Sequence, residues 1–294
     1  MADYYGSFKI SGNMDTNLLK TILASFLRED IGRGDLTSES IFSPDEIGTA
    51  HLVARESFLI AGAARVAAQV FAIQNSAVLT ENAVADGTQV DSGKLLLTVT
   101  GPVIDLLKAE RVALNLLQRI SGIATYTALF VEKVKNYPAR ICDTRKTTPG
   151  LRMIEKYGVV AGGGSNHRFN LADGVLIKDN HIAACGSIAK AVAKVREKVP
   201  HTLRLEVETD TLNQVRECLD CGVDIIMLDN MSVKQMAEAV EIIDGKAIVE
   251  ASGGIGLANV EEVAKTGVDF ISIGALTHSA PACDIGMDWS VSDR

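Results

Sequence analysis

The chain has 294 residues, of which 47% are hydrophobic, 22% charged and 5% aromatic, with 25 glycines and 6 prolines. This composition is typical of a globular α/β protein and excludes a disordered or fibrous chain, and the length suffices for one α/β barrel or for a large domain with a smaller one. The net charge of −8 argues against non-specific binding to nucleic acid or to an anionic membrane surface.

Targeting signals and cysteines bear on the cellular compartment. The first ten residues, MADYYGSFKI, lack the basic and apolar regions of a secretory signal, and no apolar run approaches the roughly 18 residues of a membrane span. The five cysteines are an odd number spread over a large chain, which argues against a disulfide framework. We therefore expect a cytoplasmic protein with free thiols.

Residues 1–114 predict an α+β domain. An amphipathic helix is expected over residues 16–29, followed by strand-like segments such as TAHLVARESFLIAG and the glycine-punctuated ADGTQVDSGKLLLTVTG. Residues 103–135 predict two helices broken near Ser121 and Gly122, and we place the domain boundary inside this stretch, near Leu114. The tail, residues 280–294, is expected to pack back onto the first domain.

Residues 115–279 repeat a strand followed by a helix. Six β-branched runs end in polar residues and start roughly 20 to 35 residues apart, the length of a strand with its crossover helix: ARICDTRK, GVLIKDNH, LRLEVETD, DIIMLDNM, AIVEASGG and FISIGALT. Apolar residues recur at helical spacing between them, in SIAKAVAKVREKV, TLNQVRECLDCG, SVKQMAEAVEIIDG and LANVEEVAKTG. Polar Glu206, Glu208 and Glu250 lie within strands, which favours a barrel over a doubly wound sheet. The predicted fold class is α/β, with a TIM-like C-terminal barrel.

One segment is basic within this acidic chain. Residues 140–181 hold seven Lys and Arg against four Asp and Glu, a local charge of +3, and they also contain His167 and His181. A cationic patch of this kind predicts a small polyanionic ligand.

Charged side chains follow four consecutive strands of the predicted barrel. They are Asp143, Arg145 and Lys146 after the first strand, Lys178 after the second, Glu208 after the third, and Asp229 with Asn230 after the fourth. Any one of them alone could equally be an ion-paired residue of the rim. In a barrel, however, the carboxyl ends of all strands meet at one mouth, where active sites lie. The pattern therefore predicts an active site.

Small residues end the last two strands. Ser252, Gly253 and Gly254 follow one strand, and Gly274 to Thr277 follow the other. Backbone N–H groups at such turns approach phosphate oxygens, and barrels commonly bind phosphate after their last two strands. The alternative is that these glycines only form tight turns.

Three further features bear on ligand binding. An Arg such as Arg168 binds a planar carboxylate with two hydrogen bonds while a neighbouring His167 imidazole donates another, unless the segment only caps a helix. Glu208 and Asp229 are hard oxygen ligands that suit Mg²⁺ held jointly with substrate phosphates, and no His/Cys cluster has zinc spacing. The Cys218-x-x-Cys221 pair falls at the end of a predicted outer helix, where we expect no redox or metal function.

Several motifs together resemble one family. The runs DTRKTTPGLR, GGGSNHR, IKDNHI, EVE, IMLDN, ASGGI and ISIGALTHS, in this order, resemble quinolinate phosphoribosyltransferase, also called nicotinate-nucleotide pyrophosphorylase (carboxylating). Matches in LREDIGRGDLT, ARESFLIAG and ERVALNLLQRISGIAT extend the resemblance over almost the whole chain. It implies a pentosyltransferase of NAD biosynthesis, which joins quinolinate to phosphoribosyl pyrophosphate with Mg²⁺ and gives nicotinate mononucleotide, pyrophosphate and CO₂.

The resemblance also implies an architecture and a set of site residues. The family fold is an N-terminal α/β sandwich with an open or irregular barrel, in a homodimer whose sites are completed by the neighbouring subunit; assembly beyond the dimer stays open. By motif, Lys146, Glu208 and Asp229 are the implied catalytic residues, and the two acids lie near the ribose and the metal, which they contact directly or through substrate. The implied substrate-binding residues also include Arg111 from the partner, Thr144, Arg145, His167, Arg168, Lys178, Ser252, Gly253, Gly254, Ile273, Gly274 and Ala275.

Three alternatives stay open at this point. A relative of the molybdenum-locus type shares the fold but has a different substrate, and the complete basic set argues against it. A barrel aldolase would use Lys146 or Lys178 as a Schiff-base nucleophile in a desolvated pocket. A non-catalytic metabolite-binding barrel would bind ligand without releasing pyrophosphate.

Overall fold

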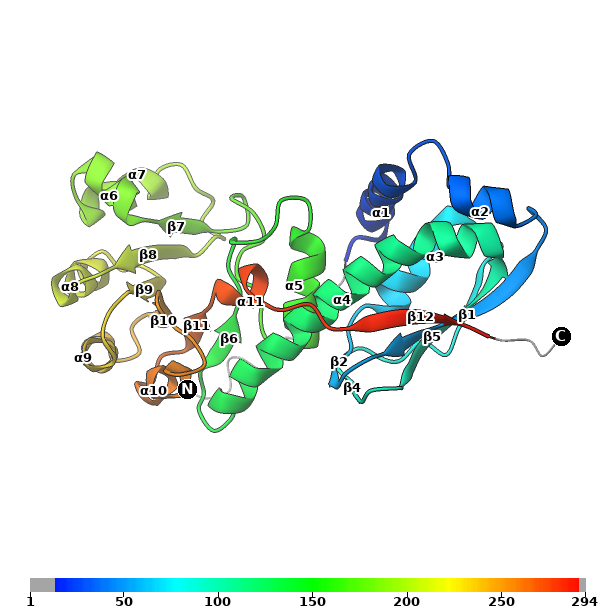
Figure 1. Ribbon diagram of the computed structural model, residues 1–294. Helices are drawn as coiled ribbons and strands as arrows, with labels where there is room; N and C mark the ends of the chain where they lie inside the picture. The colour runs from blue at the N-terminus through cyan, green and yellow to red at the C-terminus, as the bar shows by residue number, and fades with distance from the viewer. Residues whose placement is uncertain (1–13, 291–294) are drawn as a thin grey trace. The chain divides into compact units, whose positions relative to one another are not determined.

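A computed structural model describes residues 14–290 and divides them into two compact units (Figure 1). Unit 1 comprises residues 14–126, Thr148–Gly163 and residues 280–290, and unit 2 comprises Thr127–Thr147 and Gly164–Ser279. The segment considered above for a secretory signal, residues 1–10, and the last part of the expected tail, residues 291–294, lie outside the described residues. Among the helices of residues 14–290, none has both the length and the hydrophobicity needed to span a bilayer.

Unit 1 is an α+β unit built on an antiparallel sheet of four strands. The strand order is β12-β1-β5-β3, and a separate pair joins β2 to β4. The bounds are β1 Ile47–Ala54, β2 Phe58–Leu59, β3 Leu79–Glu81, β4 Gln89–Val90, β5 Leu95–Pro102 and β12 Ile285–Trp289. The tail therefore returns to unit 1, where β12 pairs antiparallel with β1.

Helices pack their apolar faces into the core of unit 1. They are α1 Thr16–Ile31, the π-helical turn η1 Ala63–Ala67, α3 Ala68–Gln74 and α5 Arg152–Ala161. A short further helix, α2 Leu36–Ile41, leaves Leu36 and Ile41 exposed. The predicted N-terminal helix is confirmed: the Asp15 carboxylate accepts the N–H groups of Asn17 and Leu18, both at 2.9 Å, and so caps α1. Leu23, Leu52 and Phe71 are fully buried in the core.

The predicted helix break at Ser121 and Gly122 is wrong. A single helix, α4, runs over Val103–Val134. The Ser121 hydroxyl is buried and accepts the Ala61 N–H at 3.2 Å, and a Cβ on Gly122 would lie 1.9 Å from the Pro281 carbonyl oxygen. The two small residues therefore let other segments approach α4. The division between the units falls within α4 after Tyr126, further along the chain than Leu114.

Unit 2 is built on a parallel sheet of six strands, and each predicted run forms one of them. The strands are β6 Arg140–Cys142, β7 Val175–Ile177, β8 Leu205–Thr209, β9 Ile225–Asp229, β10 Ile248–Ser252 and β11 Phe270–Ser272. Their order is β6-β11-β10-β9-β8-β7, with β6 and β7 at the two edges. The α/β class and the open arrangement of the strands are therefore confirmed.

Helices follow the strands of unit 2 (Figure 1). They are α6 Asp179–Cys185, α7 Ile188–Arg196, α8 Leu212–Asp220, α9 Val233–Ile243, α10 Val260–Lys265 and α11 Ala275–His278. The four predicted outer helices are confirmed. Thr211 and Ser232 begin α8 and α9 with capping boxes, in which the Gln three residues later bonds back to the cap.

Candidate active site

One cavity in unit 2 gathers most of the predicted site residues. Its volume is about 490 Å³, and it opens at the carboxyl ends of the parallel strands. It is lined by Thr144, Arg145, Lys146, His167, Arg168, Leu176, Lys178, Glu208, Met227, Asp229, Asn230, Glu250, Ser252, Gly253, Gly254 and Ser272. Strands of one parallel sheet present their carboxyl ends at the same edge, which is why residues far apart in the sequence meet here.

Arg111 is the predicted residue that belongs to the other unit. It lies on α4 in unit 1, its side chain is 57% exposed, and its guanidinium is 4.0 Å from the Glu110 carboxylate. The second predicted phosphate segment, Ile273 to Ala275, does not line the cavity directly, but it contacts a residue that does. A Cβ on Gly274 would lie 2.8 Å from the Lys146 Cδ.

Lys146 is held by Thr144 and by residues that follow β11. Its backbone N–H donates to the Thr144 hydroxyl at 3.0 Å, and its carbonyl accepts the Thr277 hydroxyl at 2.8 Å. Together with the close approach of Gly274, these contacts fix the stem of Lys146. The small residues after β11 thus hold a cationic side chain at the cavity.

Asp143 anchors the glycine-rich segment that carries the His–Arg pair. Its carboxylate is fully buried and accepts the His167 N–H at 2.8 Å and the Asn166 amide at 2.6 Å. The Arg168 guanidinium donates to the Gly174 carbonyl at 2.9 Å. The segment is therefore fixed to β6 at one end and to the start of β7 at the other.

Glu208 and Asp229 place carboxylate oxygens at the ends of β8 and β9. The Lys178 ammonium is 3.7 Å from Glu208 Oε2, which is buried and accepts no hydrogen bond from the described residues. Burial raises the pKa of Glu208, Lys178 lowers it, and the nearby Asp229 raises it again. Both acids also line a neighbouring cavity of about 460 Å³ together with Asp179 and Asp210. This concentration of hard oxygen atoms fits a magnesium ion.

The phosphate-loop candidate after β10 has an unusual backbone. Gly253 and Gly254 have φ angles of +83° and +63°, which other residues rarely adopt. A Cβ on Gly253 would lie 2.3 Å from the Asn230 Oδ1. The loop is held further along by Asn259, which accepts the Gly256 N–H at 2.8 Å and donates to the Gly254 carbonyl at 3.1 Å.

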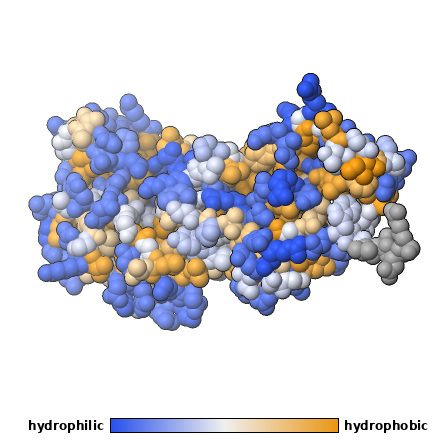
Figure 2. All heavy atoms as spheres, in the orientation of Figure 1, coloured by the Kyte–Doolittle hydropathy of each residue, from blue (hydrophilic) through white to orange (hydrophobic). Residues whose placement is uncertain are grey.

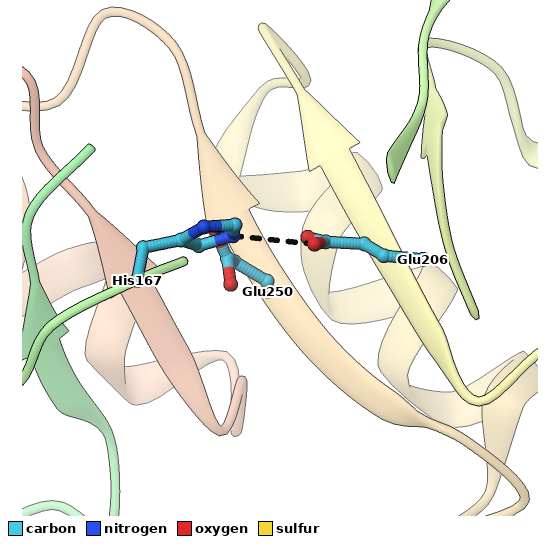
Figure 3. A group of neighbouring side chains, drawn as sticks. All are labelled: His167, Glu206 and Glu250. Atoms are coloured by element: carbon cyan, nitrogen blue, oxygen red, sulfur yellow. Dashed lines mark ion pairs between the residues drawn. The ribbon is translucent and has the colours of Figure 1, made fainter. Parts of the chain in front are cut away.

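His167 points into the sheet of unit 2 and meets two buried carboxylates (Figure 3). Its Nε2 is 3.2 Å from Glu206 Oε2 and 3.6 Å from Glu250 Oε1. Its Nδ1 accepts the Arg168 N–H at 2.8 Å. Sequence reasoning noted the two acids only as polar positions within strands and assigned them no partner. The alternation of Glu206 with Glu208 on one strand was the available signal.

The buried pair makes stability depend on pH. Burial, together with the charge of the neighbouring Glu206, raises the pKa of Glu250 to about 7, although His167 lowers it. An acid whose pKa is raised on folding contributes stability below its ordinary pKa of 4.5 that is lost as the pH rises toward 7. Glu250→Gln cannot ionise, so we expect it to be more stable than the parent at pH 8, by about 1–3 kcal/mol. Urea unfolding should show this difference shrinking toward pH 5, and a constant difference would contradict the prediction.

The cysteine pair on α8 offers no reactive thiol. Cys218 is buried, and burial raises the pKa of its thiol to about 12. Cys221 caps the end of the helix, and burial also raises the pKa of its thiol.

The chain is similar to known proteins over most of its length. Residues 123–288 match the family described as quinolinate phosphoribosyl transferase, C-terminal domain, and residues 35–121 match its N-terminal domain. A probable nicotinate-nucleotide pyrophosphorylase [carboxylating] of Bacillus subtilis is 46% identical over 276 residues, which cover 94% of this chain and 95% of that protein. The corresponding enzyme of Mycobacterium leprae is 44% identical over 269 residues, covering 89% and 94%.

Solved structures agree. The crystal structure of NadC from Streptococcus pyogenes has a TM-score of 0.90 and 41% identity, and the match covers 95% of this chain and 99% of that one. The nicotinate-nucleotide pyrophosphorylase of Ehrlichia chaffeensis has a TM-score of 0.87 and 42% identity, covering 92% and 98%.

Proposed function

Because the chain belongs to the quinolinate phosphoribosyltransferase family, we propose that the cavity of unit 2 is its active site. The chain catalyses the decarboxylating transfer of a phosphoribosyl group to quinolinate, a step of NAD biosynthesis. One observation carries the assignment of the site: four cationic side chains, three carboxylates and a glycine loop line the same cavity.

The cationic side of the cavity suits quinolinate, which carries two adjacent carboxylates. Its cations are Arg145, Lys146, Arg168 and Lys178. A guanidinium offers two parallel N–H groups to a carboxylate, whereas an ammonium acts as a compact point charge. This set can therefore neutralise both carboxylates and orient the ring.

The opposite side suits phosphoribosyl pyrophosphate. Glu208 and Asp229 would hold Mg²⁺, directly or through the substrate, and the bound ion would neutralise charge on the departing pyrophosphate. Ser252 to Gly254 would offer backbone N–H groups to the 5′-phosphate or pyrophosphate oxygens. Ile273 to Ala275 would complete this region, and Gly274 lies close to the side chain of Lys146.

The chemistry needs no covalent intermediate with the protein. The pyridine nitrogen of quinolinate forms the new bond to the anomeric carbon as the bond to pyrophosphate breaks, and nearby carboxylates stabilise the cation-like ribosyl centre. The carbon–carbon bond to the 2-carboxylate then breaks and releases CO₂. Its electron pair stays on the ring carbon beside the cationic nitrogen, which stabilises it until a proton is taken up.

A homodimer would supply Arg111 from the neighbouring subunit to this cavity. The exposure of the Arg111 side chain supports such a role. Leu36 and Ile41 of α2 are 84% and 66% exposed, and Figure 2 shows hydrophobic side chains at the surface in this region. Exposed hydrophobic side chains that lie together favour association. A cytoplasmic location stays a prediction of the sequence.

The direct test is an activity assay. The protein incubated with quinolinate, phosphoribosyl pyrophosphate and Mg²⁺ should release nicotinate mononucleotide, pyrophosphate and CO₂ in equal amounts. If no product forms and a titration detects no quinolinate binding, the molybdenum-locus relative with another substrate becomes the better assignment. Ligand binding without pyrophosphate release would favour a non-catalytic barrel.

The aldolase alternative is less compatible with the cavity. A Schiff-base lysine needs a desolvated pocket that favours the neutral amine. The Lys178 side chain is instead 47% exposed and lies 3.7 Å from the Glu208 carboxylate. Borohydride trapping with carbonyl substrates should therefore leave the protein unmodified.

A further inference from the structure

The carboxylates of Glu206 and Glu250 are buried, Glu250 also lines the cavity, and neither has a part in the reaction proposed above. Their side chains are each 6% exposed, and Oε1 of each is buried without a hydrogen bond from the described residues. Glu206 Oε2 and Glu250 Oε1 lie beside the His167 ring (Figure 3). Burying a carboxylate is unfavourable in free energy unless it binds a specific partner. The burial of these two side chains therefore indicates that they have a function.

The ring nitrogens of His167 define the contact. Nδ1 accepts the Arg168 N–H, so the proton of the neutral ring is on Nε2. Nε2–H therefore donates toward Glu206 at 3.2 Å, with Glu250 at 3.6 Å. One nitrogen or oxygen atom of each of the three side chains lies within 4.8 Å of the other two, a spacing that would also allow them to bind a metal ion. A nitrogen that carries a proton has no lone pair for a metal, so the geometry favours a hydrogen-bonded group.

The ring also connects the sheet to the segment that carries Arg168. That segment is held by Asp143 after β6, and the Arg168 guanidinium is tied to the Gly174 carbonyl before β7. The His167 ring adds a third attachment, from β8 and β10 to the Arg168 backbone N–H. Without it, the Arg168 backbone N–H would lose its acceptor, and the segment would keep only the other two attachments.

We propose that Glu206 and Glu250 are positioning residues for the dicarboxylate substrate: they hold the His167 ring, which holds the Arg168 backbone so that its guanidinium faces the cavity. This inference rests on the proposed function, because it takes the cationic side of the cavity to be the quinolinate site. His167 lines the cavity, but both its ring nitrogens face protein groups, so in this proposal it acts on the quinolinate site through Arg168.

The test compares alanine with glutamine at both positions. Glu206→Ala and Glu250→Ala should each raise the KM for quinolinate about tenfold or more, and should leave the KM for phosphoribosyl pyrophosphate within about twofold. Glu206→Gln and Glu250→Gln should keep the quinolinate KM near the parent value, because an amide retains an acceptor oxygen for Nε2–H. Glu217→Ala is the matched control, because this carboxylate accepts the Ala189 N–H on the outer helices.

A second measurement does not depend on the folding of variants. Nitrogen NMR of the histidine rings in the parent protein should show a neutral ring that is protonated at Nε2 and accepts a hydrogen bond at Nδ1. A ring protonated at Nδ1 would overturn the proposal. Alanine variants that keep the quinolinate KM would also overturn it, and so would glutamine variants that raise this KM as much as the alanine variants do.

Two outcomes distinguish this proposal from a metal site and from a failure of the proposed function. Stoichiometric metal in the parent protein that is absent from Glu206→Ala would replace the positioning role with a metal site. A parent protein that makes no nicotinate mononucleotide would instead contradict the proposed function. The NMR experiment would still test the protonation of the His167 ring, because it does not depend on activity.

Discussion

Gly253→Ala is expected to destabilise the protein by about 2–4 kcal/mol and to lower kcat/KM by about 100-fold or more. The φ angle of +83° disfavours any side chain, and the new Cβ would lie 2.3 Å from the Asn230 Oδ1 and 2.8 Å from its backbone nitrogen. Asn230 itself has a φ of +55° and donates its backbone N–H to the Ser252 carbonyl at 2.9 Å. The overlap must therefore move the ends of both β9 and β10, where Asp229 and the phosphate loop lie.

Gly245→Ala is the matched control for this prediction. Gly245 has a φ of +70°, and a Cβ there would meet no atom within 4 Å. It follows α9 outside the cavity, so alanine should cost only the backbone strain of about 1–2 kcal/mol and should leave kcat/KM nearly unchanged. Urea unfolding and initial rates measure both variants. Equal losses of activity in the two would show that backbone strain alone, and not displacement of Asn230, explains the effect.

Arg111→Ala and Lys146→Ala are each expected to lower kcat/KM by about 100-fold to 1,000-fold while leaving the chain folded. Lys146 lines the cavity of unit 2, whereas Arg111 lies on α4 in unit 1 and is exposed. If the neighbouring subunit supplies Arg111, a mixed dimer of the two variants has one complete site. Random re-association should then restore about a quarter of the parent activity, because half of the dimers are mixed and each has one of its two sites intact.

The decisive measurement is the rate after dissociation and re-association of the mixed variants. Each variant taken through the same treatment alone should stay inactive, and circular dichroism should confirm that both remain folded. A mixture that stays inactive although mixed dimers have formed would mean that the site is completed within one subunit.

Most of unit 2 could be predicted from the sequence because its signals are local. Each strand is a short β-branched run, each helix repeats apolar residues at helical spacing, and the polar residues at the strand ends meet wherever parallel strands are joined by helices. Knowledge of the strand order was not needed to expect that Lys178, Glu208 and Asp229 share one edge. The cavity confirms that they lie together, while their individual roles stay predictions.

The features that sequence reasoning missed depend on contacts between distant residues. Ser121 and Gly122 look like a helix break, but Gly122 makes room for the Pro281 carbonyl, which lies far along the chain. The group formed by His167, Glu206 and Glu250 depends on how a loop residue meets the interior faces of two strands. The periodicity of a single segment cannot predict a contact between residues of different segments.

The late return of the chain to unit 1 has a consequence for synthesis on the ribosome. β1 lies between β12 and β5, and Cys283 and Ile285 belong to the same hydrophobic core as Leu52 and Phe71. While unit 2 is being translated, β12 does not yet exist, so one side of β1 presents unpaired backbone groups. The first-made part of the protein thus completes its sheet after the second, and a nascent chain stalled within unit 2 exposes a strand edge that chaperones or other copies can bind.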